Sequence, residues 1–277
     1  MALILGIVAA RLFPGLGIYG PTLGVILGAI FQVLILSPAF WSVGSSLRPV
    51  WQFSDPRLRE IVALLIPNGL AVGVNYAGNI ADTAFASMAR EGAALGALYN
   101  GWLLVGLPIA LLGQAVGQAA FPRLAAAAEL EAWPALRRLL LFALGAVFGL
   151  SLLAMAALIV LGRITIQVLF ERGEFTPAAG DLTYQVLIAY AIALPAYVGT
   201  EVISRGLIAL RDTRTPLLTN TVQLVGRAAI MAFFVSRTGV IAIPAALAIT
   251  AMLETVVLGS VLFVRIQRRI KISLPLK

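Results

Sequence analysis

The sequence contains no cysteine and no histidine, and only 12% of its 277 residues are charged. Without cysteine it can form neither a disulfide framework nor a thiolate metal site. Without histidine it lacks the usual imidazole base and the commonest metal ligand, and a Ser/His/Asp arrangement is impossible. The sequence also has no acidic cluster suited to a metal and no glycine-rich phosphate loop before a lysine. We therefore expect a protein that is not an enzyme, with no metal and no cofactor.

The shortage of charge excludes a typical water-soluble domain, in which about 25% of residues are charged. Hydrophobic residues make up 61% of the chain, which also excludes disorder. The net charge of +8 comes from 20 Lys and Arg against 12 Asp and Glu. Because the basic residues lie mostly between apolar stretches, they indicate the cytoplasmic face of a membrane protein and no nucleic-acid partner.

Long apolar stretches separated by charge predict about eight helices, and hence an all-α, polytopic membrane bundle. Residues 1–13 are too short for a full span of about 20 residues, so we expect them to be the end of a helix whose beginning is missing. The expected helices cover residues 1–13, 18–43, 57–89, 93–122, 134–161, 178–209, 215–236 and 239–266.

The basic residues of the loops predict the orientation in the membrane, because cytoplasmic loops are enriched in Lys and Arg. One alternate set of loops and ends holds thirteen: Arg48, Arg57, Arg59, Arg123, Arg137, Arg138, Arg211, Arg214, Arg265, Arg268, Arg269, Lys271 and Lys277. The opposite set holds five: Arg11, Arg90, Arg163, Arg172 and Arg237. The first set is predicted to be cytoplasmic, which places both termini there and the 163–177 loop outside.

Polar residues recur at helical spacing inside several apolar spans, so that each group shares one helix face. Such stripes on several helices predict a bundle around a polar interior and favour a transporter over a scaffold. The candidate cavity residues are Asn75, Asn79, Asp82, Asn100, Gln114, Gln118, Glu201, Arg205, Asn220, Gln223, Arg227 and Glu254.

The alternative interpretation of these residues is structural, because amides also join membrane helices without any substrate. Intramembrane charges are costly and need a wet cavity or a partner. Glu201 and Arg205 are four residues apart, which favours mutual neutralisation. Arg227 has no acid before it at helical spacing in its own span. We therefore predict that Arg227 lines the cavity as a lone cation, contributes to anion binding, and can be replaced without loss of folding.

Four segments, taken together and in this order, resemble the MurJ (MviN) lipid II flippases, which share a superfamily with the MATE and polysaccharide exporters (the MOP superfamily). The most specific are Phe-Glu-Arg-Gly-Glu-Phe, within residues 169–176, and Arg-Asp-Thr-Arg-Thr-Pro, within 209–216. The other two are Gly-Gln-Ala-Val-Gly-Gln-Ala-Ala-Phe-Pro-Arg-Leu, at 113–124, and Tyr-Ala-Ile-Ala-Leu-Pro-Ala-Tyr, at 190–197.

The resemblance implies a domain organisation, since members of the family have fourteen helices in two six-helix lobes and a final pair. It makes residues 1–44 the last two helices of the first lobe, 45–56 a cytoplasmic linker, 57–266 the six-helix second lobe and 267–277 a basic cytoplasmic tail. The first four and last two helices of the family have no counterpart. Most family arginines for the lipid-linked diphosphate lie in those first helices, and Trp102 and Leu103 replace a further Asp-Arg pair.

The resemblance further implies a multi-pass protein of the bacterial inner membrane that serves peptidoglycan biosynthesis and cell shape. Its expected activity is to move lipid II, a lipid-linked anionic substrate, from the inner to the outer leaflet by alternating access. Two alternatives stay open: another exporter of lipid-linked oligosaccharide or amphipathic compounds, and a truncated membrane subunit that does not transport. Membrane lipids, a second copy of the chain or a partner for the missing lobe are the expected contacts.

Overall fold

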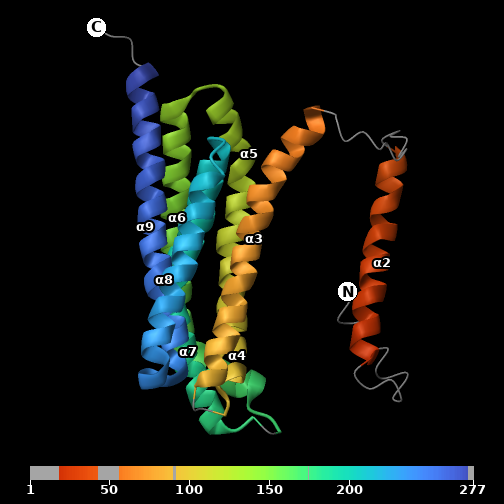
Figure 1. Cartoon of the computed structure of the whole chain (residues 1–277), viewed down its shortest axis with the longest axis vertical. Coiled ribbons are helices and arrows are strands. Elements are labelled where there is room, and N and C mark those ends of the chain that lie inside the picture. Colours follow the sequence, from red (N-terminus) through yellow and green to blue (C-terminus); the bar gives the residue numbers. More distant parts are fainter. Residues whose placement is uncertain (1–18, 43–55, 90–91, 174, 274–277) are drawn as a thin grey trace. The chain divides into compact units, whose positions relative to one another are not determined.

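The computed structural model describes residues 19–42, 56–89, 92–173 and 175–273 (Figure 1). Every element in these ranges is helical, which confirms the predicted all-α class. The chain divides into two units, Met1–Asp55 and Pro56–Lys277. In the first, α2 (Tyr19–Ser42) matches the helix expected at 18–43. The predicted helix at 1–13 and nearly all of the predicted linker lie outside the described residues.

The second unit is a bundle of long helices. Its elements are α3 (Pro56–Met88), α4 (Ala94–Pro108), η2 (Ile109–Gln114), α5 (Ala115–Glu129), α6 (Trp133–Phe170), α7 (Pro177–Ala209), α8 (Arg214–Thr238), η3 (Gly239–Ile241) and α9 (Ala242–Ser273). Helices α4 and α5 are continuous through η2, a π-helical turn that follows Pro108. Since proline has no N–H for the helix ladder, a local change of helix type at this point is expected.

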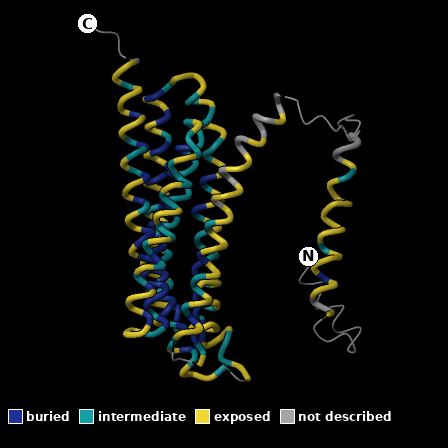
Figure 2. Tube along the Cα trace, in the orientation of Figure 1, coloured by how far each residue is buried: buried dark blue, intermediate teal, exposed yellow. Residues whose placement is uncertain are grey.

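Helix α7 forms the centre of the bundle, where it packs against α4, α6 and α9. Its buried positions run along its whole length and appear dark blue in Figure 2. Many large apolar side chains of the outer helices are exposed instead, among them Phe142, Leu153 and Val160 of α6. Four helical segments within the described ranges are long and apolar enough to cross a membrane: Ala94–Glu129, Trp133–Phe170, Pro177–Ala209 and Arg214–Ile272. Exposed apolar flanks on such helices are what a lipid environment requires.

Three predicted helix ends were wrong, because the buried face of each helix continues beyond the first charge. Helix α5 runs to Glu129 and not to 122, with Leu124 fully buried. Helix α6 runs to Phe170 and not to 161, so Arg163 belongs to a helix and not to a loop. Helix α9 runs to Ser273 and not to 266, and Ile270, beyond the predicted end, packs against the core.

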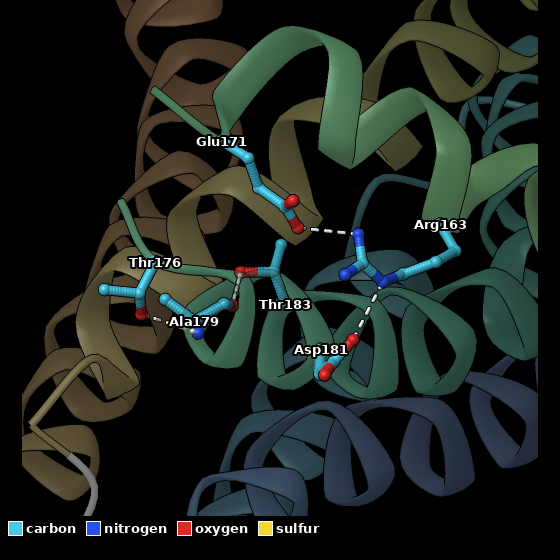
Figure 3. Close-up of polar contacts among 6 residues, drawn as sticks. All are labelled: Arg163, Glu171, Thr176, Ala179, Asp181 and Thr183. Carbon is cyan, nitrogen blue, oxygen red and sulfur yellow. Dashed lines mark hydrogen bonds and ion pairs between the residues drawn. The ribbon is translucent and has the colours of Figure 1, made fainter. Parts of the chain in front are cut away.

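The turn between α6 and α7 is held by an ion-pair network around Arg163 (Figure 3). Arg163 Nη1 lies 2.6 Å from Glu171 Oε1, and its Nε lies 2.8 Å from Asp181 Oδ1. Thr176 caps the start of α7 with its side-chain oxygen. The absence of a side chain at Gly180 leaves room for this carboxylate, since a Cβ at this position would overlap Glu171 Oε1. The Phe-Glu-Arg-Gly-Glu-Phe segment therefore supplies Glu171, one of the two acids in an ion-pair network that joins α6 to α7.

The turn between α7 and α8 is held by Asp212, within the Arg-Asp-Thr-Arg-Thr-Pro segment. Its carboxylate accepts hydrogen bonds from the backbone N–H groups of Arg214 and Thr215 and pairs with Arg265 of α9 at 2.5 Å. Burial alone would raise the pKa of Asp212, but the hydrogen bonds from Thr215 and the nearby Arg265 hold the pKa below its ordinary value. Both specific motifs thus fix helix ends, at opposite ends of the bundle (Figure 1).

Candidate functional site

The second unit contains a cavity of about 660 Å³ whose lining comes from five helices. Helix α3 contributes amides and a carboxylate, α4 and α7 contribute aromatic rings, and α8 contributes an amide and a guanidinium. The lining residues are Asn75, Asn79, Asp82, Thr83, Leu95, Leu98, Tyr99, Trp102, Tyr190, Tyr197, Gln223, Arg227 and Leu247. We call this space the central cavity.

An ion pair between Asp82 of α3 and Arg227 of α8 is the main electrostatic feature of the central cavity. Both side chains are largely buried, with relative exposures of 16% for Asp82 and 8% for Arg227. The prediction of Arg227 as a lone cation was therefore wrong, because its acid comes from another helix. The pair neutralises both charges, so Arg227 does not give the cavity a free positive charge for an anion.

The backbone of α3 makes room for this pair at Gly78, one turn before Asp82. A Cβ at Gly78 would lie 3.2 Å from Nη1 of Arg227, which is tighter than an ordinary van der Waals contact. The contact brings α3 and α8, which pack along each other, close enough for a direct guanidinium–carboxylate interaction. Even so, Asp82 Oδ1 and Arg227 Nε are buried without a hydrogen-bond partner.

Aromatic side chains form the opposite wall of the central cavity. The ring of Trp102 meets Tyr190 and Tyr197 edge to face, with centroids 5.3 and 5.7 Å apart. The Tyr197 hydroxyl is buried and also has no hydrogen-bond partner. Three polar atoms with unmet hydrogen-bonding capacity thus belong to residues of one cavity, which can complete their bonds with water or with a polar ligand after a small movement.

The structure brings together five of the predicted cavity residues: Asn75, Asn79, Asp82, Gln223 and Arg227. Sequence reasoning did not include the aromatic wall among the candidates. The signal was present in the spacing of Tyr99 and Trp102 on α4, three residues apart, and of Tyr190 and Tyr197 on α7, seven apart. Aromatic residues at such spacing are common in apolar helix faces, so the pattern alone does not distinguish a cavity wall from lipid-facing packing.

The other seven candidates do not line the central cavity. Gln114 and Gln118 are exposed, and Asn100 and Asn220 are partly buried. Glu201 and Arg205 lie 4.0 Å apart on α7, as their spacing predicted. They pack against the turn formed by η2 and α5, where Gly113 and Gly117 approach them. Glu254 lies in a separate groove between α8 and α9.

The described residues contain no group of three or more acidic side chains that could hold a metal ion. What the central cavity offers is a set of amide, hydroxyl and aromatic groups around a neutralised ion pair. Such a surface binds polar or amphipathic groups by hydrogen bonds and ring contacts. A helical bundle with apolar flanks and a polar interior of this kind defines a multi-pass membrane protein of the transporter class.

Comparison with known proteins assigns the family. The sequence model of the family described as "Lipid II flippase MurJ" matches residues 1–275. The chain belongs to this family, which confirms the resemblance and the multi-pass bacterial membrane class. A probable lipid II flippase MurJ of Vibrio cholerae is 28% identical over 239 residues, covering 86% of this chain and 45% of that protein. A probable lipid II flippase MurJ of Rhizobium meliloti is 29% identical over 204 residues, covering 72% of this chain and 37% of that protein. The chain thus spans less than half the length of these relatives.

Solved structures confirm the fold. A lipid II flippase MurJ in an inward closed conformation superposes with a TM-score of 0.73 at 22% identity, over 96% of this chain and 56% of that one. An inward-facing multidrug resistance MATE family transporter of the MOP superfamily superposes with a TM-score of 0.80 at 17% identity, over 99% and 65%. The architecture is therefore common to both kinds of transporter.

Proposed function

We propose that this chain is part of a lipid II flippase, which moves lipid-linked peptidoglycan precursor from the inner to the outer leaflet by alternating access. The match of the family model to residues 1–275 carries the proposal. Its second unit supplies one wall of the transport pathway, and the central cavity is the surface that meets the substrate. Such a protein performs transport and no covalent chemistry.

The composition of the central cavity indicates which part of the substrate this wall of the pathway contacts. Because Asp82 neutralises Arg227, this wall has amide and aromatic groups to offer and no free cation among the described lining residues. We infer that the phosphates of the substrate are bound by segments of the full-length relatives that this chain does not cover. Expressed alone, these 277 residues are then not sufficient for flipping, since alternating access requires two bodies that move around a site between them.

A rescue experiment tests this proposal. In cells depleted of their own flippase, we expect a chimera of this chain with the uncovered portion of the Vibrio cholerae relative to restore growth. The 277 residues alone, at an equal level in the membrane, are expected not to do so. A chimera that folds and reaches the membrane without restoring growth would favour one of the alternatives, another exporter or a subunit that does not transport.

We also propose the orientation that the basic residues predict, with both termini in the cytoplasm. The chain has no native cysteine, so a thiol reagent can label only the cysteine that a single substitution introduces. Glu129→Cys, on the exposed end of α5, is expected to resist an impermeant thiol reagent added to intact cells, whereas Ala178→Cys, on the exposed start of α7, reacts fully. Permeabilised cells supply the control, in which both sites react. Labelling of Glu129→Cys from outside would reverse the orientation.

A further inference from the structure

A second space, the α8–α9 groove, is distinct from the central cavity in its chemistry. It measures about 300 Å³, and its walls are largely apolar. Leu218 and Val222 of α8 face Leu253 and Val257 of α9 across it. Within these walls lies one carboxyl group, that of Glu254. We propose that Glu254 is a proton-binding site, which carries its proton at neutral pH while α8 stays packed against α9.

The hydrogen bonding of Glu254 supports the neutral form. Its Oε1 lies 3.2 Å from the Thr219 hydroxyl of α8, which shares its one hydrogen between this carboxyl and the Pro216 carbonyl at 3.1 Å. The other hydroxyl of the groove, that of Thr250, donates to the carbonyl groups of its own helix and is not available to the carboxyl. An ionised carboxylate in an apolar groove needs several hydrogen bonds or a cation to offset its lost hydration. One bond from a hydroxyl falls short of that requirement.

The charged groups of the surrounding helices do not supply a cation either. Among the described residues, none forms an ion pair with Glu254. The arginines of α6, α7, α8 and α9 that form ion pairs have acidic partners other than Glu254. Arg227 of α8 pairs with Asp82 of α3, and Arg205 of α7 pairs with Glu201. Arg163 of α6 pairs with Glu171 and Asp181. Arg265, on α9 itself, pairs with Asp212. The buried Tyr197 hydroxyl of α7 belongs to the central cavity, and a phenol is in any case neutral at this pH and supplies no cation.

The position of Glu254 couples proton binding to the packing of α8 on α9. The groove lies between these two helices, and Thr219 bridges them through its bond to the carboxyl. Any movement that separates α8 from α9 admits water to the carboxyl and favours its ionisation. By linkage, protonation favours the arrangement in which α8 and α9 are packed together. This inference does not depend on which substrate the protein transports.

Infrared spectroscopy of the purified full chain in lipid tests the proposal directly. At neutral pH, the difference spectrum between the native chain and Glu254→Gln is expected to contain the C=O stretching band of a protonated carboxyl. The matched control is Glu129→Gln, an exposed carboxylate, whose difference spectrum should contain only the bands of the ionised form. Carboxylate bands in the Glu254→Gln difference spectrum would overturn the proposal.

Two further measurements make the test independent of how well Glu254→Gln folds. Thr219→Val removes the hydrogen bond that favours ionisation, so the protonated band is expected to persist to higher pH than in the native chain, whereas Thr219→Ser keeps the native midpoint. In the native chain, dicyclohexylcarbodiimide, which adds to protonated carboxyls in apolar surroundings, is expected to label Glu254 and to leave Asp82 unlabelled. Identical midpoints for all three chains, or labelling of Asp82 in preference to Glu254, would contradict the assignment.

Discussion

Arg227→Leu is expected to lower the free energy of unfolding by about 3–5 kcal/mol, the cost of leaving one partner of a buried ion pair unpaired. The substitution would leave the Asp82 carboxylate inside the bundle with no cation. Thermal unfolding of the purified chain in detergent, followed by circular dichroism, measures the loss. This expectation replaces the one drawn from the sequence, in which Arg227 stood alone and its removal left folding intact.

Two controls isolate the effect of the unpaired charge. Arg205→Leu breaks a partly exposed pair at 4.0 Å and is expected to cost only about 0–1 kcal/mol. The double substitution Asp82→Leu with Arg227→Leu removes both charges and should return the stability close to that of the native chain. If Arg227→Leu unfolds at the same temperature as Arg205→Leu, Asp82 and Arg227 do not form a buried pair in the folded protein.

Gly206→Leu is the second substitution with a large expected effect, about 1–3 kcal/mol of destabilisation from overpacking. Gly206 lies on α7, where a Cβ would be 2.8 Å from Leu262 of α9 and 3.4 Å from Leu140 of α6. Both leucines are fully buried, so neither can move aside without disturbing the core. The added side chain would force α7 away from its neighbours in the centre of the bundle.

The matched control for this prediction is Gly149→Leu on α6. Gly149 is exposed, and a Cβ there would meet no atom within 4 Å. Leucine has a higher helix propensity than glycine by several tenths of a kcal/mol, so this variant should be as stable as the native chain or more so. Equal unfolding temperatures for the two leucine variants would mean that α7 is not packed closely at Gly206.

The helices could be predicted from the sequence because apolar runs bounded by charge are a local property of the chain. The central cavity could be predicted in part, since Asn79 and Asp82 share a face of α3 and Gln223 and Arg227 share a face of α8. The partner of Arg227 could not, because it depends on which helices pack together. The role of Gln114 and Gln118 stays a prediction: both side chains are exposed on the described bundle, and helical periodicity does not tell a face that meets lipid from a face that meets another part of a transporter.

The motifs that identify the family illustrate a second limit of sequence reasoning. Asp212 and Glu171 belong to its two most specific segments, yet both secure turns at the ends of helices and neither lines the central cavity. Their spacing is specific because a helix cap and an ion pair each require a particular side chain at a particular turn. A polar cavity wall sets a weaker spacing requirement, since amides and aromatic rings from several helices can form it in many combinations.

The most direct test of the account compares two forms of the chimera with the Vibrio cholerae relative in cells depleted of their own flippase. One form has the native central cavity, and the other has Asp82→Leu together with Arg227→Leu, which should preserve folding. The account predicts equal amounts of both proteins in the membrane, restored growth with the native cavity, and little or no growth with the double variant. Equal growth with both forms would contradict a transport role for this cavity.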